Sequence, residues 1–366
     1  KIINPNFYLH ENGVTCMCPN AAIGETGTVK SVTYTKRTRE QITTENAATT
    51  CTSEITDMSN LFRDKTTFNK NISSWDVSSV TNMYCMFGAT SYNFNMSFNQ
   101  DISSWDVSNV TNMGIMFATA KKFNQPIGNW DVSKVINMAG MFMYAWDFNQ
   151  PIENWNVSNV IDMSYIFQST RFDQPIGDWD VSNVVNMEGM FNGARSFNQP
   201  IGNWDVSKVI NMSWMFTAAT NFNQTINDWN VSNATNMDWM FGNTTFNKPI
   251  DKWCVQRIMT EPLNFSSSLL TENKPKWGTE CTTLSNPEFT NLSSQLTISP
   301  NPFTSSVKIN LSENTKVKQI QVINAVGQTV YASTETALNL EHLPAGMYFV
   351  KVNTNQGIAT EKIIKN

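Results

Sequence analysis

The sequence of 366 residues is poor in charge and almost without histidine. Asp, Glu, Lys and Arg make up 15% of it, against roughly 25% in a typical soluble domain. The net charge is −5 and no cluster of Lys and Arg occurs, so the basic stripe that nucleic-acid binding requires is missing. No run of 18 apolar residues occurs either, and the sequence therefore predicts no membrane-spanning helix.

Recognisable catalytic motifs are also missing. The two histidines are His10 and His342, and a Ser-His-Asp or Cys-His site would need one of them beside a nucleophile. No HExxH, paired CxxC, Walker loop or GxGxxG pattern occurs. We therefore expect no enzyme activity, no bound metal and no cofactor.

What the sequence does contain is one unit repeated about eight times. The stretch FNQPIGNWDVSKVINM occurs letter for letter at 123–138 and at 197–212. Successive Trp residues of the repeat are 24 or 25 positions apart, except for one interval of 30 positions, and Phe and Met recur with the same period. The Trp residues are Trp75, Trp105, Trp130, Trp155, Trp179, Trp204, Trp229 and Trp253. A fixed period held over this many units predicts a repeat solenoid, in which neighbouring coils stack and share one core.

Each coil of the solenoid is predicted to combine a short parallel strand with a short helix, as in a leucine-rich repeat. Trp and Val flank Asp in "WDV", which is the alternation of a strand. Met138, Met141 and Phe142 stand at i, i+3 and i+4, as on one face of a helical turn, and Asn137 is a plausible cap before them. The stretch "NQPIG" reads as a turn.

The sequence on both sides of the repeats predicts further domains. We expect an N-terminal cap over 1–57, the repeats over 58–253 and a C-terminal cap over 254–281. Residues 282–295 are rich in Ser, Thr and Asn and read as a linker. From 296 to 366 alternating strands are broken by Pro and Gly turns, which predicts a small all-β, immunoglobulin-like sandwich.

Five of the six cysteines flank the repeats, which suggests that disulfide bonds stabilise the two ends of the array. We predict a Cys254–Cys281 bridge in the C-terminal cap, because an open end of the array must be covered. Cys18 and Cys51 are the predicted bridge of the N-terminal cap. The pairing of Cys16 and Cys85 stays open, because the sequence does not show whether their Cα atoms approach.

A column of acidic residues, one per repeat, is the first candidate for chemistry: Asp76, Asp106, Asp131, Asp180 and Asp205. Stacked carboxylates would suit Ca²⁺ or a glycosidase. However, Asn156 and Asn230 occupy the same position in their repeats. Asn retains a side-chain oxygen as hydrogen-bond acceptor but carries no charge. This favours an Asx-type hydrogen bond to the following turn.

We call the residues at one equivalent position of successive repeats a column. Aromatic residues outside the regular Trp and Phe columns are the candidate binding residues. Trp214, Trp239 and Tyr165 lie in a variable column inside "NMxxMF", and Tyr144 and Trp146 lie in the turn before Phe148. Such rings bind sugars or protein partners, or else they only cover a flank of the array or pack against the C-terminal region. The longest repeat has five extra residues around Ser91–Ser97, which mark either a binding loop or a tolerated bulge.

Two family resemblances follow from these residues. "ISPNPF" at 298–303, "NAVGQTV" at 324–330, "LPAGMYFVKV" at 343–352 and the final "EKIIKN" resemble the C-terminal sorting domain of the type IX secretion system of Bacteroidetes. "FNQPIGNWDVSKV", "NMxxMF" and "WCV…NKPKWGTEC" resemble the BspA-like surface repeats over about 51–281.

These resemblances imply export across the outer membrane after removal of a signal peptide, and a location outside the cell or on its outer surface. The secretion components would bind residues 296–366. We expect an adhesion or binding protein with a glycan or protein ligand. The alternatives are a structural or accessory subunit of an outer-membrane protein complex and an enzyme that acts on polysaccharide through the Asp column.

Overall fold

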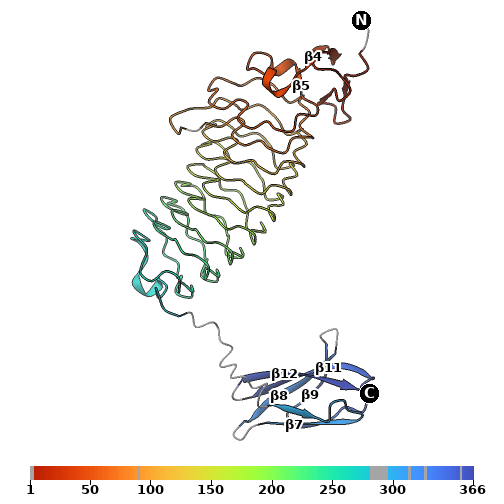
Figure 1. Cartoon of the computed structure of the whole chain (residues 1–366). Helices are drawn as coiled ribbons and strands as arrows, with labels where there is room; N and C mark the ends of the chain where they lie inside the picture. The colour runs from red at the N-terminus through yellow and green to blue at the C-terminus, as the bar shows by residue number, and fades with distance from the viewer. Residues whose placement is uncertain (1–3, 90, 281–295, 312–314, 325–327, 355–356) are drawn as a thin grey trace. The chain divides into compact units, whose positions relative to one another are not determined.

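The computed structural model describes residues 4–89, 91–280, 296–311, 315–324, 328–354 and 357–366, and Figure 1 shows their arrangement. The chain divides into two compact units, Lys1–Cys281 and Thr282–Asn366. The predicted linker at 282–295 lies outside the described residues.

The first unit opens with small sheets. Strands β1 (Tyr8–Leu9) and β2 (Cys16–Met17) pair antiparallel. A second sheet has the order β3-β4-β5, with bounds Thr26–Val29, Val32–Lys36 and Thr50–Cys51. The 3-10 helices η1 (Arg39–Gln41) and η2 (Ala47–Thr49) lie between β4 and β5. This sheet borders a small core of its own that contains Phe7, Cys18 and Cys51.

The repeats follow as coils that lie one above the next (Figure 1). The indole N–H of Trp130 donates to the carbonyl of Ile102 in the previous coil at 3.2 Å, and the same bond recurs at every later Trp of the column. Two Phe columns stack beside it; for example, the ring centroids of Phe142 and Phe148 are 3.8 Å apart. The Trp, Phe and Met columns are buried in one continuous core, as the sequence predicts.

The predicted leucine-rich-repeat-like solenoid, with a strand and a helix in each coil, is wrong. No α-helix and no strand occurs among the described residues from 58 to 253, and the next regular element is the 3-10 helix η3 (Thr271–Asn273). Neighbouring coils instead share single parallel bridges, one per coil, such as Asn112 to Asn137 and Asn137 to Asp162. The bridges therefore lie at "NM" and not at "WDV".

Backbone hydrogen bonds explain why Met138, Met141 and Phe142 form no helix. The N–H groups of Met138, Gly140, Phe142 and Tyr144 all donate to carbonyls of the following coil, at 2.7–3.1 Å. The N–H groups between them close tight turns within the coil, for example from Met141 to the carbonyl of Met138. An α-helix directs every N–H along its own axis, so a segment that alternates in this way cannot be one.

The turns of most coils place two residues, four positions apart, at positive φ. Gly140 has φ +60° and Tyr144 has φ +59°. The variable column found in the sequence is the first of these left-handed positions in all of its seven members: Cys85, Ile115, Gly140, Tyr165, Gly189, Trp214 and Trp239. Because a left-handed residue other than Gly costs roughly 1–2 kcal/mol, the bonds between coils must offset this cost repeatedly.

Both ends of the repeats bond to neighbouring segments. The first coil has no earlier coil to donate to its carbonyls, and the guanidinium of Arg39 donates Nη2–H to the carbonyl of Ser59. At the other end Trp239 and Phe241 donate their N–H groups to the carbonyls of Leu263 and Phe265 at 2.8 Å.

The described residues of the second unit form seven strands in two antiparallel sheets. One has the order β10-β7-β6, with bounds Ala337–Asn339, Ser306–Asn310 and Thr297–Ser299. The other has the order β12-β11-β8-β9, with bounds Gly357–Lys365, Gly346–Thr354, Val317–Asn324 and Thr329–Ser333. All seven strands lie in segments that the sequence marks as strands, and they share one apolar core. The chain is thus built from small separate sheets and from turns.

Candidate functional site

The Asp column is a set of turn acceptors. Asp131 Oδ1 accepts the N–H of Ser133 at 3.0 Å, and Asn156 Oδ1 accepts the N–H of Ser158 at 3.1 Å. Hydrogen bonds from Ser133 hold the pKa of Asp131 below its usual value. The predicted Asx-type bond is confirmed, and Asn performs it as well as Asp. Across the described parts of the chain, no group of three or more His, Cys, Asp and Glu side chains is placed to hold a metal ion.

Tyr165 is held in place by the next coil. Its hydroxyl donates to Glu188 Oε1, and Asn211 donates to the other carboxylate oxygen at 3.0 Å. Burial and the bond to Glu188 raise the pKa of Tyr165 well above its usual value. Its ring also covers Gly189. Tyr165 therefore packs between coils and offers little free surface to a ligand.

Trp214 and Trp239 form a stacked pair in successive coils. Their ring centroids are 5.1 Å apart and their planes differ by 8°. Trp214 remains 38% exposed, whereas Trp239 is partly covered and packs over Gly242. The structure thus brings these two predicted residues together, and each ring uses one face on the other.

Tyr144 and Trp146 belong to a different group of side chains, at the turn before the Phe column. Trp146 is 44% exposed, and the guanidinium of Arg171 lies over its ring, 5.3 Å from the centroid. Tyr144 contacts Tyr92, with 6.5 Å between ring centroids. Tyr92 is 68% exposed and comes from the five-residue insertion.

Backbone bonds fix this group in space. Asp147 donates its N–H to the carbonyl of Lys121, and Arg171 donates to the carbonyl of Trp146, both at 3.0 Å. The insertion is anchored by Met96, which is 2% exposed and donates its N–H to the carbonyl of Thr119 at 3.1 Å. We call this surface the turn strip and define it by Tyr92, Lys121, Lys122, Tyr144, Trp146, Arg171 and Arg195.

Sequence reasoning named two residues of the turn strip, marked the insertion that contains Tyr92 as either a binding loop or a tolerated bulge, and missed the other four. The signal was present: aligned on the following Phe, four consecutive repeats read "AKKF", "AWDF", "STRF" and "ARSF", so each carries a cation or an aromatic. The contact between Tyr92 and Tyr144 had no such signal, because an irregular insertion makes it.

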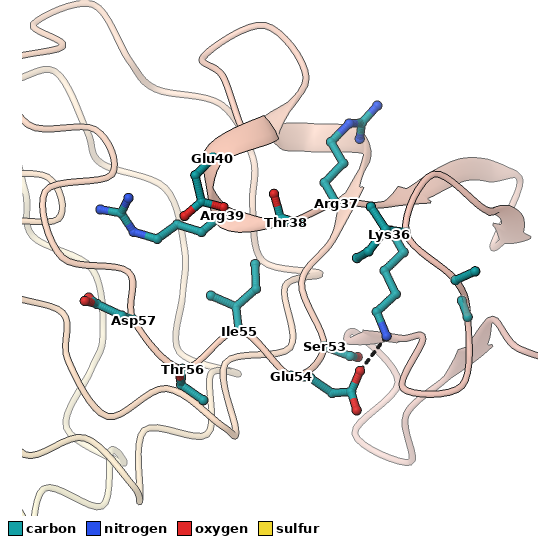
Figure 2. Close-up of a pocket in the computed structure, with 13 residues that line it drawn as sticks. Lys36, Arg37, Thr38, Arg39, Glu40, Ser53, Glu54, Ile55, Thr56 and Asp57 are labelled. Atoms are coloured by element: carbon teal, nitrogen blue, oxygen red, sulfur yellow. Dashed lines mark hydrogen bonds and ion pairs between the residues drawn. The ribbon is translucent and has the colours of Figure 1, made fainter.

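A large open cleft lies elsewhere, beside the first coil. It has a volume of about 610 Å³ and is bordered by the segments 36–40 and 53–57 (Figure 2). Lys36 is buried and pairs with Glu54 at 2.5 Å. Nε of Arg39 is buried without a hydrogen-bond partner among the described residues, while its Nη2 binds the carbonyl of Ser59. Of the cations that border this cleft, Arg39 thus bonds to the first coil, whereas Lys36 pairs with Glu54 and Arg37 donates to the carbonyl of Thr49.

The cysteines follow the prediction where the structure describes them. Cys18 and Cys51 form a disulfide with 6.3 Å between their Cα atoms. Cys254 is disulfide-bonded, and its predicted partner Cys281 lies outside the described residues. Cys16 and Cys85, whose pairing the sequence left open, are buried free thiols.

Comparison with known families adds to this picture. Residues 30–97, 90–175 and 163–277 match the family described as "Mycoplasma protein of unknown function, DUF285". These stretches cover more than half of the chain, which therefore belongs to that family. No curated protein matches the chain.

Residues 297–366 match the secretion system C-terminal sorting domain, which confirms the resemblance of the tail. This domain supports export through the type IX secretion system, with that machinery as a partner. It also implies a location at the cell surface or outside the cell. In the described part of the chain, no helix has the length and apolar character needed to cross a membrane.

Proposed function

We propose that the chain is a surface protein of the BspA-like kind, without enzyme activity, whose turn strip binds a partner and so serves adhesion. One observation carries this proposal. Every Trp and Phe of the regular columns is buried, whereas Trp146 and Tyr92 are 44% and 68% exposed at one turn. Aromatic side chains dominate the energetics of binding surfaces. Rings that remain exposed to water do not contribute to packing within the repeats.

The test is binding of the purified full chain to a panel of matrix proteins, mucins and polysaccharides, measured by biolayer interferometry. Tyr92→Ala with Trp146→Ala should raise the Kd of the bound component about tenfold or more, as loss of hot-spot rings does. The matched control is Ile161→Ala with Ile210→Ala, because these side chains are 48% and 45% exposed and lie outside the turn strip.

Two results would overturn the proposal. One is that no member of the panel binds. The other is that the aromatic double variant binds as well as the control. If an outer-membrane protein instead co-purifies stoichiometrically with the chain and the double variant retains it, the chain is an accessory subunit of an outer-membrane complex.

A further inference from the structure

The turn strip combines its aromatic rings with a local excess of positive charge. Lys121, Lys122, Arg171 and Arg195 are exposed and come from three of the five consecutive coils that form the strip, in a chain with a net charge of −5. Among the residues that the structure describes, Asp147 is the one carboxylate paired with them: it contacts Lys122 at 3.0 Å and Arg171 at 3.5 Å. Within the described ranges, Lys121 and Arg195 make no ion pair.

The cations and rings follow one line from coil to coil. Lys121, Trp146, Arg171 and Arg195 each lie eight residues after the Met of the "NM" or "DM" pair in their repeats. The backbone bonds described above join Asp147 to Lys121 and Arg171 to Trp146. A ligand that meets all of them must be extended along the stack. It must also carry negative groups at intervals and apolar faces that can lie against Trp146 and Tyr92.

We propose that the turn strip binds an acidic polysaccharide, an inference that rests on the proposed binding function and names its ligand class. The C–H faces of sugar rings pack against aromatic rings, and carboxylate or sulfate groups pair with Lys and Arg. An extended acidic peptide fits less well, because peptides commonly add to free backbone groups of an exposed strand. At this turn the N–H groups of Asp147 and Arg171 are already bonded between coils.

The test uses the full chain and four defined probes: alginate, chondroitin sulfate, neutral dextran and poly-glutamate. We expect alginate or chondroitin sulfate to bind and dextran not to bind. Affinity should fall about tenfold or more between about 50 mM and about 200 mM salt, as for any polyanion held by several cations.

A pair of charge variants decides whether the turn strip is the site. Lys121→Ala with Arg195→Ala should raise the Kd for the acidic polysaccharide about tenfold. Lys70→Ala with Arg257→Ala removes the same charge from exposed positions elsewhere and should change it less than twofold. Equal effects of the two variants would overturn the assignment.

The remaining outcomes separate this inference from the proposed function. Binding of poly-glutamate as tight as that of the polysaccharides would refute the ligand class in favour of an acidic peptide. Equal binding of dextran would refute the role of charge. If none of the four probes binds while a protein of the wider panel still depends on Trp146, the polysaccharide inference fails and the adhesion proposal stands.

Discussion

The ring of Tyr165 occupies the space directly above Gly189, the residue at the equivalent position one coil further on. A Cβ atom at Gly189 would lie 2.3 Å from Cε1 of Tyr165, and Gly189 has φ +57°. Ile115 and Gly140 show the same relationship, with 2.8 Å between such a Cβ and Cγ2 of Ile115. At these two places the glycine of one coil makes room for the large side chain of the coil before it, whereas Trp214 is followed by Trp239, whose ring stacks on it instead.

Gly189→Ala should therefore destabilise the repeats. We expect a loss of about 2–4 kcal/mol in the free energy of unfolding, from the left-handed φ and from overpacking together. Gly13→Ala is the control, since it has φ +71° with no atom within 4 Å of the added Cβ, and it should cost about 1 kcal/mol. Chemical denaturation measures both, and equal losses would show that the contact with Tyr165 is unimportant.

Removing the Cys18–Cys51 disulfide should loosen the N-terminal sheets. The bridge joins residues 33 positions apart, and closing a loop of this size stabilises by roughly 3–4 kcal/mol in the chain-entropy model. Cys18→Ala with Cys51→Ala should lower the guanidinium midpoint under oxidising conditions. Added reductant should lower the midpoint of the native chain and leave the variant unchanged. A variant as stable as the native chain would contradict the role of the bridge.

The buried thiols predict a loss of stability at alkaline pH. Burial raises the pKa of Cys16 from 9.0 to about 12 and that of Cys85 to about 11. Because the folded pKa exceeds the unfolded one, this contribution is full below pH 9.0 and is lost as the pH rises toward about 12. Unfolding free energies at about pH 8 and about pH 10.5 should differ less in Cys16→Ala than in the native chain, and an unchanged difference would count against this assignment.

The Asp column should tolerate the loss of its charge and not the loss of its acceptor. Asp131→Asn keeps the bond to Ser133, as Asn156 does with Ser158, and should change the unfolding free energy by less than about 0.5 kcal/mol. Asp131→Ala removes the acceptor and should cost about 1 kcal/mol. Thermal denaturation separates the two variants. A large cost for Asp131→Asn would point to a role for the charge.

Export should depend on the second unit. Deletion of residues 297–366, which match the sorting domain, should abolish the surface-exposed and secreted pools in the producing bacterium. Cell fractionation with surface proteolysis measures this, and Tyr92→Ala in the full chain is the control that should be exported normally. A truncated chain found on the surface at the native level would show that the tail is dispensable.

Much of the repeat architecture could be predicted from the sequence, because the buried residues recur with a fixed period. The Trp and Phe columns, the Asx bonds of Asp131 and its equivalents, and the Cys18–Cys51 bridge all follow from spacing and residue type. The strands of the second unit follow from apolar alternation.

The local conformation of the coils could not be predicted in the same way. Met138, Met141 and Phe142 have the spacing of a helical face, yet a series of tight turns with left-handed residues buries the same three side chains. The period of the apolar residues indicates which side chains are buried. It does not indicate which carbonyl accepts the hydrogen bond of each backbone N–H. The contact between Tyr92 and Tyr144 was missed for a related reason, since it arises from an irregular insertion and not from a repeated position.

The alternating bonds between coils also give the repeats a chemical direction. Met138 and its equivalents donate toward the C-terminal neighbour, whereas Asp147 and Arg171 donate the opposite way. At the positions of Met138 and its equivalents, a bare first coil would therefore offer carbonyl groups and a bare last coil would offer N–H groups. Two bare arrays could therefore join head to tail through the same bonds that join coils within one chain. Arg39 binds the carbonyl of Ser59, and the carbonyls of Leu263 and Phe265 accept from the last coil, so joining two arrays in this way would first require these bonds to break.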